Sequence, residues 1–123
     1  MLDRTISTIV RPSLGRLRFD TGGAIELDRP ALLGRKPPDD QLVNGERAVA
    51  VAIPDPEHAL SRLHLEVRLE GWAVVVVDRR STNASIVTLP DAPPARLAPD
   101  EPRTIVPGTT IRLGDVVTLT YEP

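Results

Sequence analysis

Residues 63–77, LHLEVRLEGWAVVVV, determine the fold class of this chain. The first half alternates apolar with charged or histidine side chains, which predicts a strand with one buried face and one solvated face. Glu70-Gly71 then turns the chain. The run that follows, residues 72–77, has no polar face, which predicts a strand covered on both sides. Together the two runs predict a β-hairpin at the centre of a sheet.

Short segments with β-type patterns continue on both sides of this hairpin. The further strands that we predict are residues 5–10, 17–19, 24–27, 31–34, 48–53, 86–89, 104–106, 110–113 and 116–121. Thr21-Gly22-Gly23 and Pro107-Gly108 are turn sequences. Residues 36–45 and 90–102, which are rich in proline and polar side chains, predict irregular surface loops. Many short strands separated by turns favour a β-sandwich or a barrel.

One short segment carries a signal of a different kind. Asp55-Pro56 resembles the start of a helix, with a capping aspartate and a proline at the first helical position. At most one turn can follow, because strand alternation begins at Leu63. We therefore interpret residues 55–60 as a loop.

The composition limits the classes of protein to which this chain can belong. A length of 123 residues is most simply one domain, and with only three aromatic residues (Phe19, Trp72 and Tyr121) its core must be aliphatic. The absence of cysteine excludes disulfides and thiolate metal sites, and it fits a reducing compartment. A net charge of −2 and a pI near 5.6 disfavour nucleic-acid binding.

The termini and the hydropathy give a first expectation of where the chain resides. The N-terminus, MLDRTISTIV, lacks the uninterrupted apolar stretch of a signal peptide, and no apolar run is long enough to span a membrane. We therefore expect a cytoplasmic location. The sequence ends directly after its last apolar run, which suits either a domain of a longer protein or a small independent one.

Three polar islands stand where predicted strands meet loops. They are Gly34-Arg35, Ser61-Arg62-Leu63-His64 and Asp78-Arg79-Arg80-Ser81-Thr82-Asn83. They supply guanidinium groups, hydroxyls and a carboxamide, which are the groups that hold a phosphate and orient the peptide carrying it. Singly, each has an ordinary interpretation as a solvated arginine, a structural histidine or a polar turn.

In this order the islands resemble the motifs of the forkhead-associated (FHA) domain family, which binds phosphothreonine. Gly34-Arg35 is similar to the family's Gly-Arg element, and residues 61–64 match its Ser-Arg-x-His. The third island, which has Asp78, Ser81 and Asn83, resembles its Asp-x-x-Ser-x-Asn pattern. Further similarity to the family's closing pattern lies at Leu97, Pro107-Gly108, Ile111 and Leu113-Gly114-Asp115.

The resemblance is clearest over residues 25–121, and we interpret residues 1–123 as a single FHA-like domain. It implies an all-β fold, a two-sheet sandwich of about eleven short strands with the binding loops at one end, as in FHA and SMAD-like domains. The sequence departs from the family pattern at Ala84, where the family has glycine.

The resemblance also implies roles for individual residues. The phosphopeptide-binding residues would be Arg35, Ser61, Arg62, Thr82 and Asn83. The two arginines would donate charge-assisted hydrogen bonds to the phosphate, the two hydroxyls would lie beside it, and the carboxamide would bond the peptide backbone. Structural support would come from Gly34, His64 and Ser81, and Lys36 or Arg80 would add a cation.

The function that these residues imply is recognition of a threonine-phosphorylated protein or peptide, without catalysis. The partner would be a Ser/Thr kinase of the bacterial type or its substrate; we expect no metal or cofactor, no nucleic acid and no membrane insertion. One alternative is an FHA-like scaffold that has lost phosphate recognition, as the Ala84 departure suggests. Another is an accessory regulatory domain of a larger enzyme or secretion ATPase.

An enzyme is disfavoured by the spacing of its candidate groups. Ser61 lacks a Gly-x-Ser-x-Gly turn, so a nucleophile elbow is not indicated. His58 and His64 are six residues apart, so they do not form a metal-binding pair on one helix face.

Overall fold

The computed structural model describes residues 11–123 of the chain, and the strand predicted at residues 5–10 lies outside them. The described part consists of β-strands and connecting loops, without helices. The strands are β1 (Arg16–Phe19), β2 (Ala24–Glu26), β3 (Ala31–Gly34), β4 (Leu42–Val43), β5 (Glu46–Arg47), β6 (Val49–Ala52), β7 (Leu65–Glu70), β8 (Ala73–Asp78), β9 (Ser85–Thr88), β10 (Ala95–Arg96), β11 (Arg103–Ile105), β12 (Thr110–Leu113) and β13 (Val117–Glu122).

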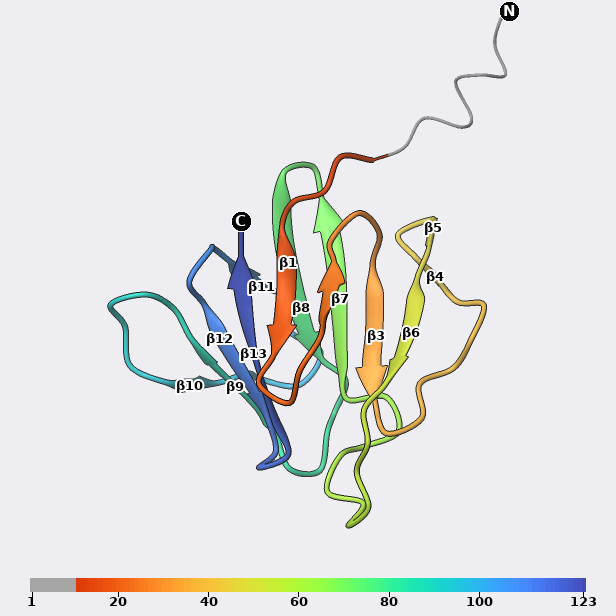
Figure 1. Cartoon of the computed structure of the whole chain (residues 1–123), viewed down its shortest axis with the longest axis vertical. Coiled ribbons are helices and arrows are strands. Elements are labelled where there is room, and N and C mark those ends of the chain that lie inside the picture. Colours follow the sequence, from red (N-terminus) through yellow and green to blue (C-terminus); the bar gives the residue numbers. More distant parts are fainter. Residues whose placement is uncertain (1–10) are drawn as a thin grey trace, which may run out of the picture.

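The strands form two packed sheets and a small ribbon (Figure 1). One sheet has the order β10-β9-β12-β13-β1-β2, the other has the order β11-β8-β7-β3-β6, and β4 pairs with β5 alone. All pairs are antiparallel except β3 with β6. The two sheets have six and five strands, in agreement with the expected sandwich of about eleven strands, so the predicted all-β fold class is confirmed.

The predicted strands between residues 17 and 121 are present, with ends shifted by no more than two residues. The predicted loop at residues 36–45 was wrong in part, since it leads into the β4–β5 ribbon around Asn44-Gly45. The predicted loop at residues 90–102 contains β10, which adds an edge to the six-stranded sheet. These strands are only two residues long, too short for an alternating pattern to be visible in the sequence.

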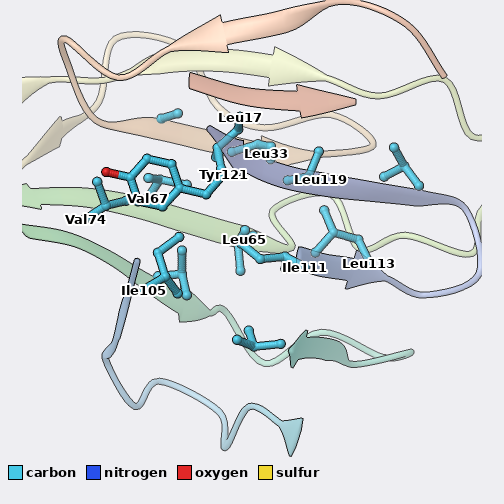
Figure 2. Packing of buried hydrophobic residues seen from close by; sticks show 14 of the residues in the cluster. Leu17, Leu33, Leu65, Val67, Val74, Ile105, Ile111, Leu113, Leu119 and Tyr121 are labelled. Carbon is cyan, nitrogen blue, oxygen red and sulfur yellow. The ribbon is translucent and has the colours of Figure 1, made fainter. Parts of the chain in front are cut away.

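The core lies between the sheets and is aliphatic, as the shortage of aromatic residues predicts (Figure 2). Inward-facing leucines, valines and isoleucines of both sheets form it, among them Leu17, Leu65 and Ile111. Tyr121 is the aromatic residue within the core cluster; burial raises the pKa of its hydroxyl, which donates a hydrogen bond of 2.7 Å to the Leu14 carbonyl. The tyrosine thus ties the start of the described chain to its last strand.

The central hairpin differs from its prediction at both ends. On the face of β7 expected to be solvated, Glu66 is only 5% exposed and pairs with Arg68 and Arg79. His64, directly before β7, is also buried, because its ring bonds Ser61 and Ala84. Trp72, expected within a strand covered on both sides, is 80% exposed because it belongs to the turn before β8. The valines of β8 are buried, as predicted.

The connections that carry the three islands meet at one end of the sandwich. The segments after β3, between β6 and β7, and between β8 and β9 lie at the lower end in Figure 1, together with the β12–β13 turn. The β7–β8 turn and the C-terminus lie at the opposite end. Within residues 11–123, no helix is long and apolar enough to cross a membrane.

Candidate functional site

The first island leaves β3 in direct contact with the second. The Arg35 amide donates to the Ser61 carbonyl at 3.0 Å, and the Lys36 amide donates to the Arg62 carbonyl at 3.1 Å. At Gly34 a side chain is excluded, because an added Cβ would lie 2.0 Å from the Arg62 carbonyl oxygen. The glycine therefore allows the close backbone approach that places Arg35 beside Ser61.

The charges of the first two islands are not neutralised by acidic neighbours. The Arg35 side chain is half-buried, and its Nε lies 3.4 Å from the Leu60 carbonyl. Among the described residues, no carboxylate forms an ion pair with Arg35, Lys36 or Arg62. Lys36 and Arg62 are exposed, and no hydrogen bond or ion pair to a described residue holds the Arg62 guanidinium. Within residues 11–123, this cluster therefore presents positive charge without a paired carboxylate.

Arg80, the other cation considered for the phosphate site, forms an ion pair with Asp100. Its Nε lies 2.5 Å from Asp100 Oδ2, on the segment of residues 90–102. Neighbouring Arg79 pairs with buried Glu66 at 2.6 Å. Of the two additional cations suggested by the sequence, only Lys36 is without an acidic partner among the described residues.

The second island is shaped by a buried carboxylate before it. Asp55 accepts hydrogen bonds from the backbone amides of Ala59 at 2.9 Å and Leu60 at 2.7 Å. The segment is a loop, as predicted, and the aspartate that resembled a helix cap satisfies amides of this loop instead. The sequence signal was visible, but its role depends on the way the loop closes.

His64 joins the second and third islands from beneath. It is fully buried; its Nδ1 accepts the Ser61 amide at 3.3 Å, and its Nε2 lies 2.9 Å from the Ala84 carbonyl. An amide donor at Nδ1 requires an unprotonated nitrogen, so the ring hydrogen is on Nε2, which donates to Ala84. The ring therefore fixes the separation of the two loops.

Asp78, the first residue of the third island, holds the rest of that island and Ala84, hereafter the recognition loop (residues 79–84). This carboxylate is 2% exposed and accepts hydrogen bonds from the Ser81 amide at 2.9 Å, the Ser81 hydroxyl at 2.5 Å and the Ser85 hydroxyl at 2.6 Å. Asp78 and Ser85 were not among the predicted site residues. The aspartate of the motif was the available signal for Asp78, and the signal for Ser85 was its hydroxyl at the position where the family pattern ends in threonine.

Two hydrogen bonds join the recognition loop to the second island and to the segment directly before it. The Thr82 amide donates to Ser61 Oγ at 3.1 Å, and Asn83 Nδ2 donates to the Ala59 carbonyl at 2.7 Å. Because Ser61 Oγ accepts from Thr82, its own hydroxyl hydrogen can still be donated to a ligand. The Thr82 and Asn83 side chains are exposed.

The backbone at Ala84 is left-handed, with a φ of 69°. Its carbonyl accepts from both His64 Nε2 and the Gly114 amide, at 2.9 Å and 3.1 Å. These bonds hold the conformation despite the alanine side chain. The alanine at this position therefore carries backbone strain.

We expect Ala84→Gly to raise the free energy of unfolding by up to about 1.6 kcal/mol. Relief of the left-handed strain at alanine raises the stability of the folded state by about 1–2 kcal/mol. The larger unfolded-state entropy of glycine lowers that stability by about 0.4–1 kcal/mol. Urea denaturation measures the change. The control is Ala24→Gly on β2, where φ is not left-handed and the substitution should destabilise. Equal destabilisation by the two variants would contradict strain at Ala84.

A pocket of about 560 Å³ adjoins the recognition loop at Asn83. It lies between the segment that begins at Asp55 and the β12–β13 turn, and Glu57, Arg112 and Asp115 contribute charged groups to its wall. A peptide held at Asn83 would have space for a neighbouring side chain here.

Comparison with solved structures identifies the architecture. No protein-family model matches the sequence, and no curated protein matches it. An FHA domain studied for its phosphothreonine-dependent interactions is 24% identical, with 91% of this chain and 97% of that chain covered and a TM-score of 0.60. The FhaA FHA domain, in complex with the intracellular domain of Rv3910, is 26% identical, with 85% and 96% covered and a TM-score of 0.58.

The FHA domain of human APLF, in complex with an XRCC1 bisphospho peptide, is 19% identical, with 89% of this chain and 98% of that chain covered and a TM-score of 0.64. In each case the similarity extends over nearly the whole sandwich. The chain therefore has the fold of the forkhead-associated domain family.

Proposed function

We propose that this domain binds a phosphothreonine-containing segment of a partner protein through Arg35, Ser61, Arg62, Thr82 and Asn83, without catalysing a reaction. The observation that carries this proposal is the position of Ser61 at the junction of all three islands. Its carbonyl accepts the Arg35 amide, and its hydroxyl accepts the Thr82 amide. Segments far apart in the sequence thereby present cations, hydroxyls and a carboxamide together.

The groups at this junction match the chemistry of a phosphothreonine. The phosphate carries a charge of roughly −1.5 to −2 at neutral pH and has three strong acceptor oxygens. Arg35 and Arg62 would provide charge-assisted donors, and the Ser61 hydroxyl would provide a neutral one. The Asn83 carboxamide would bond the peptide backbone beside the phosphothreonine and thereby set its register.

The solved neighbours support this proposal in a general way. The FhaA domain is in complex with a protein domain, and the APLF domain is in complex with a bisphospho peptide. For this chain we propose a threonine-phosphorylated partner, either a Ser/Thr kinase or its substrate, in the cytoplasm. We propose that residues 1–123 act as a single binding domain.

One observation favours the scaffold alternative. Asn83, the residue that would read the peptide backbone, already donates to the Ala59 carbonyl in the free protein. A ligand would need to replace this bond or use the remaining hydrogen and the carbonyl oxygen of the carboxamide. The left-handed Ala84 supports phosphothreonine recognition, since a positive φ at this position is what the glycine of the family pattern suggests.

We expect the domain to bind one phosphothreonine peptide several-fold to tens-fold more tightly than its phosphoserine counterpart. The expected source is a small apolar niche for the threonine methyl group, because burial of one methyl is worth about 0.8 kcal/mol or somewhat more with tight packing. Peptides selected from an oriented phosphothreonine library would be titrated by calorimetry in phosphothreonine, phosphoserine and unphosphorylated forms. Equal affinity for the two phosphopeptides would contradict the niche. Equal affinity for the unphosphorylated form would favour the scaffold.

A further inference from the structure

The recognition loop begins and ends in strained backbone. Arg80 has a φ of 56° and Ala84 a φ of 69°. Residues other than glycine seldom adopt this left-handed region. Such conformations persist where surrounding contacts over-determine them. The Ala84 end is held by His64 and Gly114, so the Arg80 end requires its own anchor.

That anchor is Asp100, which follows the third island by many residues and comes from the segment of residues 90–102. Its backbone amide donates to the Asp78 carbonyl at 2.8 Å, directly before the recognition loop. Its carboxylate lies 2.5 Å from Arg80 Nε and 3.9 Å from Arg79 Nε. One residue thus holds the start of the loop through both its backbone and its side chain.

Asp100 is itself in a stiff turn. The Ala98 carbonyl accepts the Glu101 amide at 3.2 Å, with Pro99 and Asp100 between them. Asp100 has a φ of 62°, in the position that glycine or asparagine usually occupies in a turn with proline before it. Proline fixes the backbone here, so the carboxylate is presented from a rigid base.

Arg79, the first residue of the recognition loop, is held by separate contacts to Glu66 and His64. Buried Glu66 pairs with Arg79 at 2.6 Å and also with Arg68. The Arg79 amide donates to the His64 carbonyl at 2.9 Å. With Arg79 held in this way, the contacts of Asp100 fix Arg80, the residue directly before the segment that Asp78 and Ser61 hold.

We propose that Asp100 is a positioning residue for the recognition loop, and that it orders Ser81, Thr82 and Asn83 for the phosphopeptide. This inference rests on the function proposed above. Asp100 acts through Arg80 and the Asp78 carbonyl rather than by touching the peptide.

The sign of the effect separates this role from simple electrostatics. A carboxylate near a phosphate site repels the ligand, so removal of its charge alone would strengthen binding. A positioning role has the opposite consequence, because loss of the anchor lowers the fraction of loops that are competent to bind and weakens the apparent affinity by that fraction.

The test is Asp100→Asn, which retains the backbone amide and a side chain that tolerates left-handed φ. We expect about 2–5-fold weaker binding of a phosphothreonine peptide, in the range expected for loss of an exposed ion pair. Hydrogen exchange at the amides of Ser81 and Thr82 in the free protein should become faster by a similar factor. Titrations at physiological and high salt separate this effect from long-range electrostatics.

The matched control is Asp91→Asn. Asp91 lies on the same segment, has a φ of 59°, and forms no ion pair with a described residue. Its substitution changes the net charge equally, and it should leave both affinity and exchange unchanged.

Equal or tighter binding by Asp100→Asn would overturn the proposal, as would weaker binding without faster exchange. If the wild-type domain binds no phosphopeptide, the proposed function fails, and exchange in the free protein still decides the role of Asp100. Faster exchange would then support positioning of the loop, and unchanged exchange would overturn it.

Discussion

Arg35→Ala should abolish practical phosphopeptide binding while the domain remains folded. Truncating one member of a close, hydrogen-bonded charge pair costs roughly 2–5 kcal/mol of binding free energy, which is roughly 30-fold to several thousand-fold in affinity. Arg35 has no acidic partner among the described residues, so its guanidinium is available for a phosphate. Calorimetric titration with one phosphothreonine peptide measures the loss.

The stability of this variant should change little. The Arg35 side chain is half-buried and its one side-chain hydrogen bond is long, at 3.4 Å to the Leu60 carbonyl. Arg35→Lys keeps the charge but loses the paired donors of the guanidinium, so it should restore affinity only in part.

Arg96→Ala is the matched control for this variant. Arg96 is an exposed arginine on β10 without an ion pair to a described residue, so its removal changes the net charge equally. Affinity should be retained in this control. Unchanged affinity in Arg35→Ala would mean that Arg35 does not bind the phosphate.

Gly34→Ala should damage both the fold and the binding surface. The new Cβ would lie 2.0 Å from the Arg62 carbonyl oxygen, 2.7 Å from the Arg62 carbonyl carbon and 2.8 Å from the Ser61 carbonyl oxygen. All three atoms are backbone, so no side chain can turn aside to relieve the contact. The φ of Gly34 is not left-handed, so the cost arises from lack of space alone.

To accommodate the methyl group, the end of β3 and residues 61–62 must separate. This strains or breaks the hydrogen bonds of Arg35 to Ser61 and Lys36 to Arg62, and each is worth about 0.5–1.5 kcal/mol net. With the cost of overpacking added, we expect a loss of about 2–4 kcal/mol in unfolding free energy. The corresponding fall in Tm is roughly 10 °C or more, measured by calorimetry. Phosphopeptide affinity should fall at least about ten-fold, because Arg35 and Ser61 move apart.

Gly45→Ala provides the control for this prediction. Gly45 has no atom within 4 Å of an added Cβ, but its φ is 80°, so its substitution costs about 1–2 kcal/mol through strain. It lies in the β4–β5 ribbon and should leave affinity unchanged (Figure 1). Wild-type stability and affinity in Gly34→Ala would refute the close approach of the first two islands.

Much of this architecture can be predicted from local patterns in the sequence. The strand positions follow from side-chain alternation, because a strand turns successive side chains to opposite faces. The aliphatic core follows from the shortage of aromatic residues, and the three islands follow from the order of their motifs. These features depend on residues that are close together in the chain.

Other features depend on partners that are distant in the chain. Glu66 was expected to be solvated, but it is buried, and it pairs with Arg68 of its own strand and with Arg79 of the loop after β8. Trp72 was expected to be covered, but it is exposed at a turn. β10 exists because it pairs with β9, not because two residues have a strand pattern.

At the candidate site, the residue order alone shows which chemical groups are present and that they stand at strand ends. Three features become visible only in the folded chain: Ser61 contacts both other islands, Asp78 holds the recognition loop, and Asp100 forms an ion pair with Arg80. The physical reason is that hydrogen bonds and ion pairs are satisfied by whichever groups the folded sheets bring within about 3 Å, and sequence spacing does not encode that proximity.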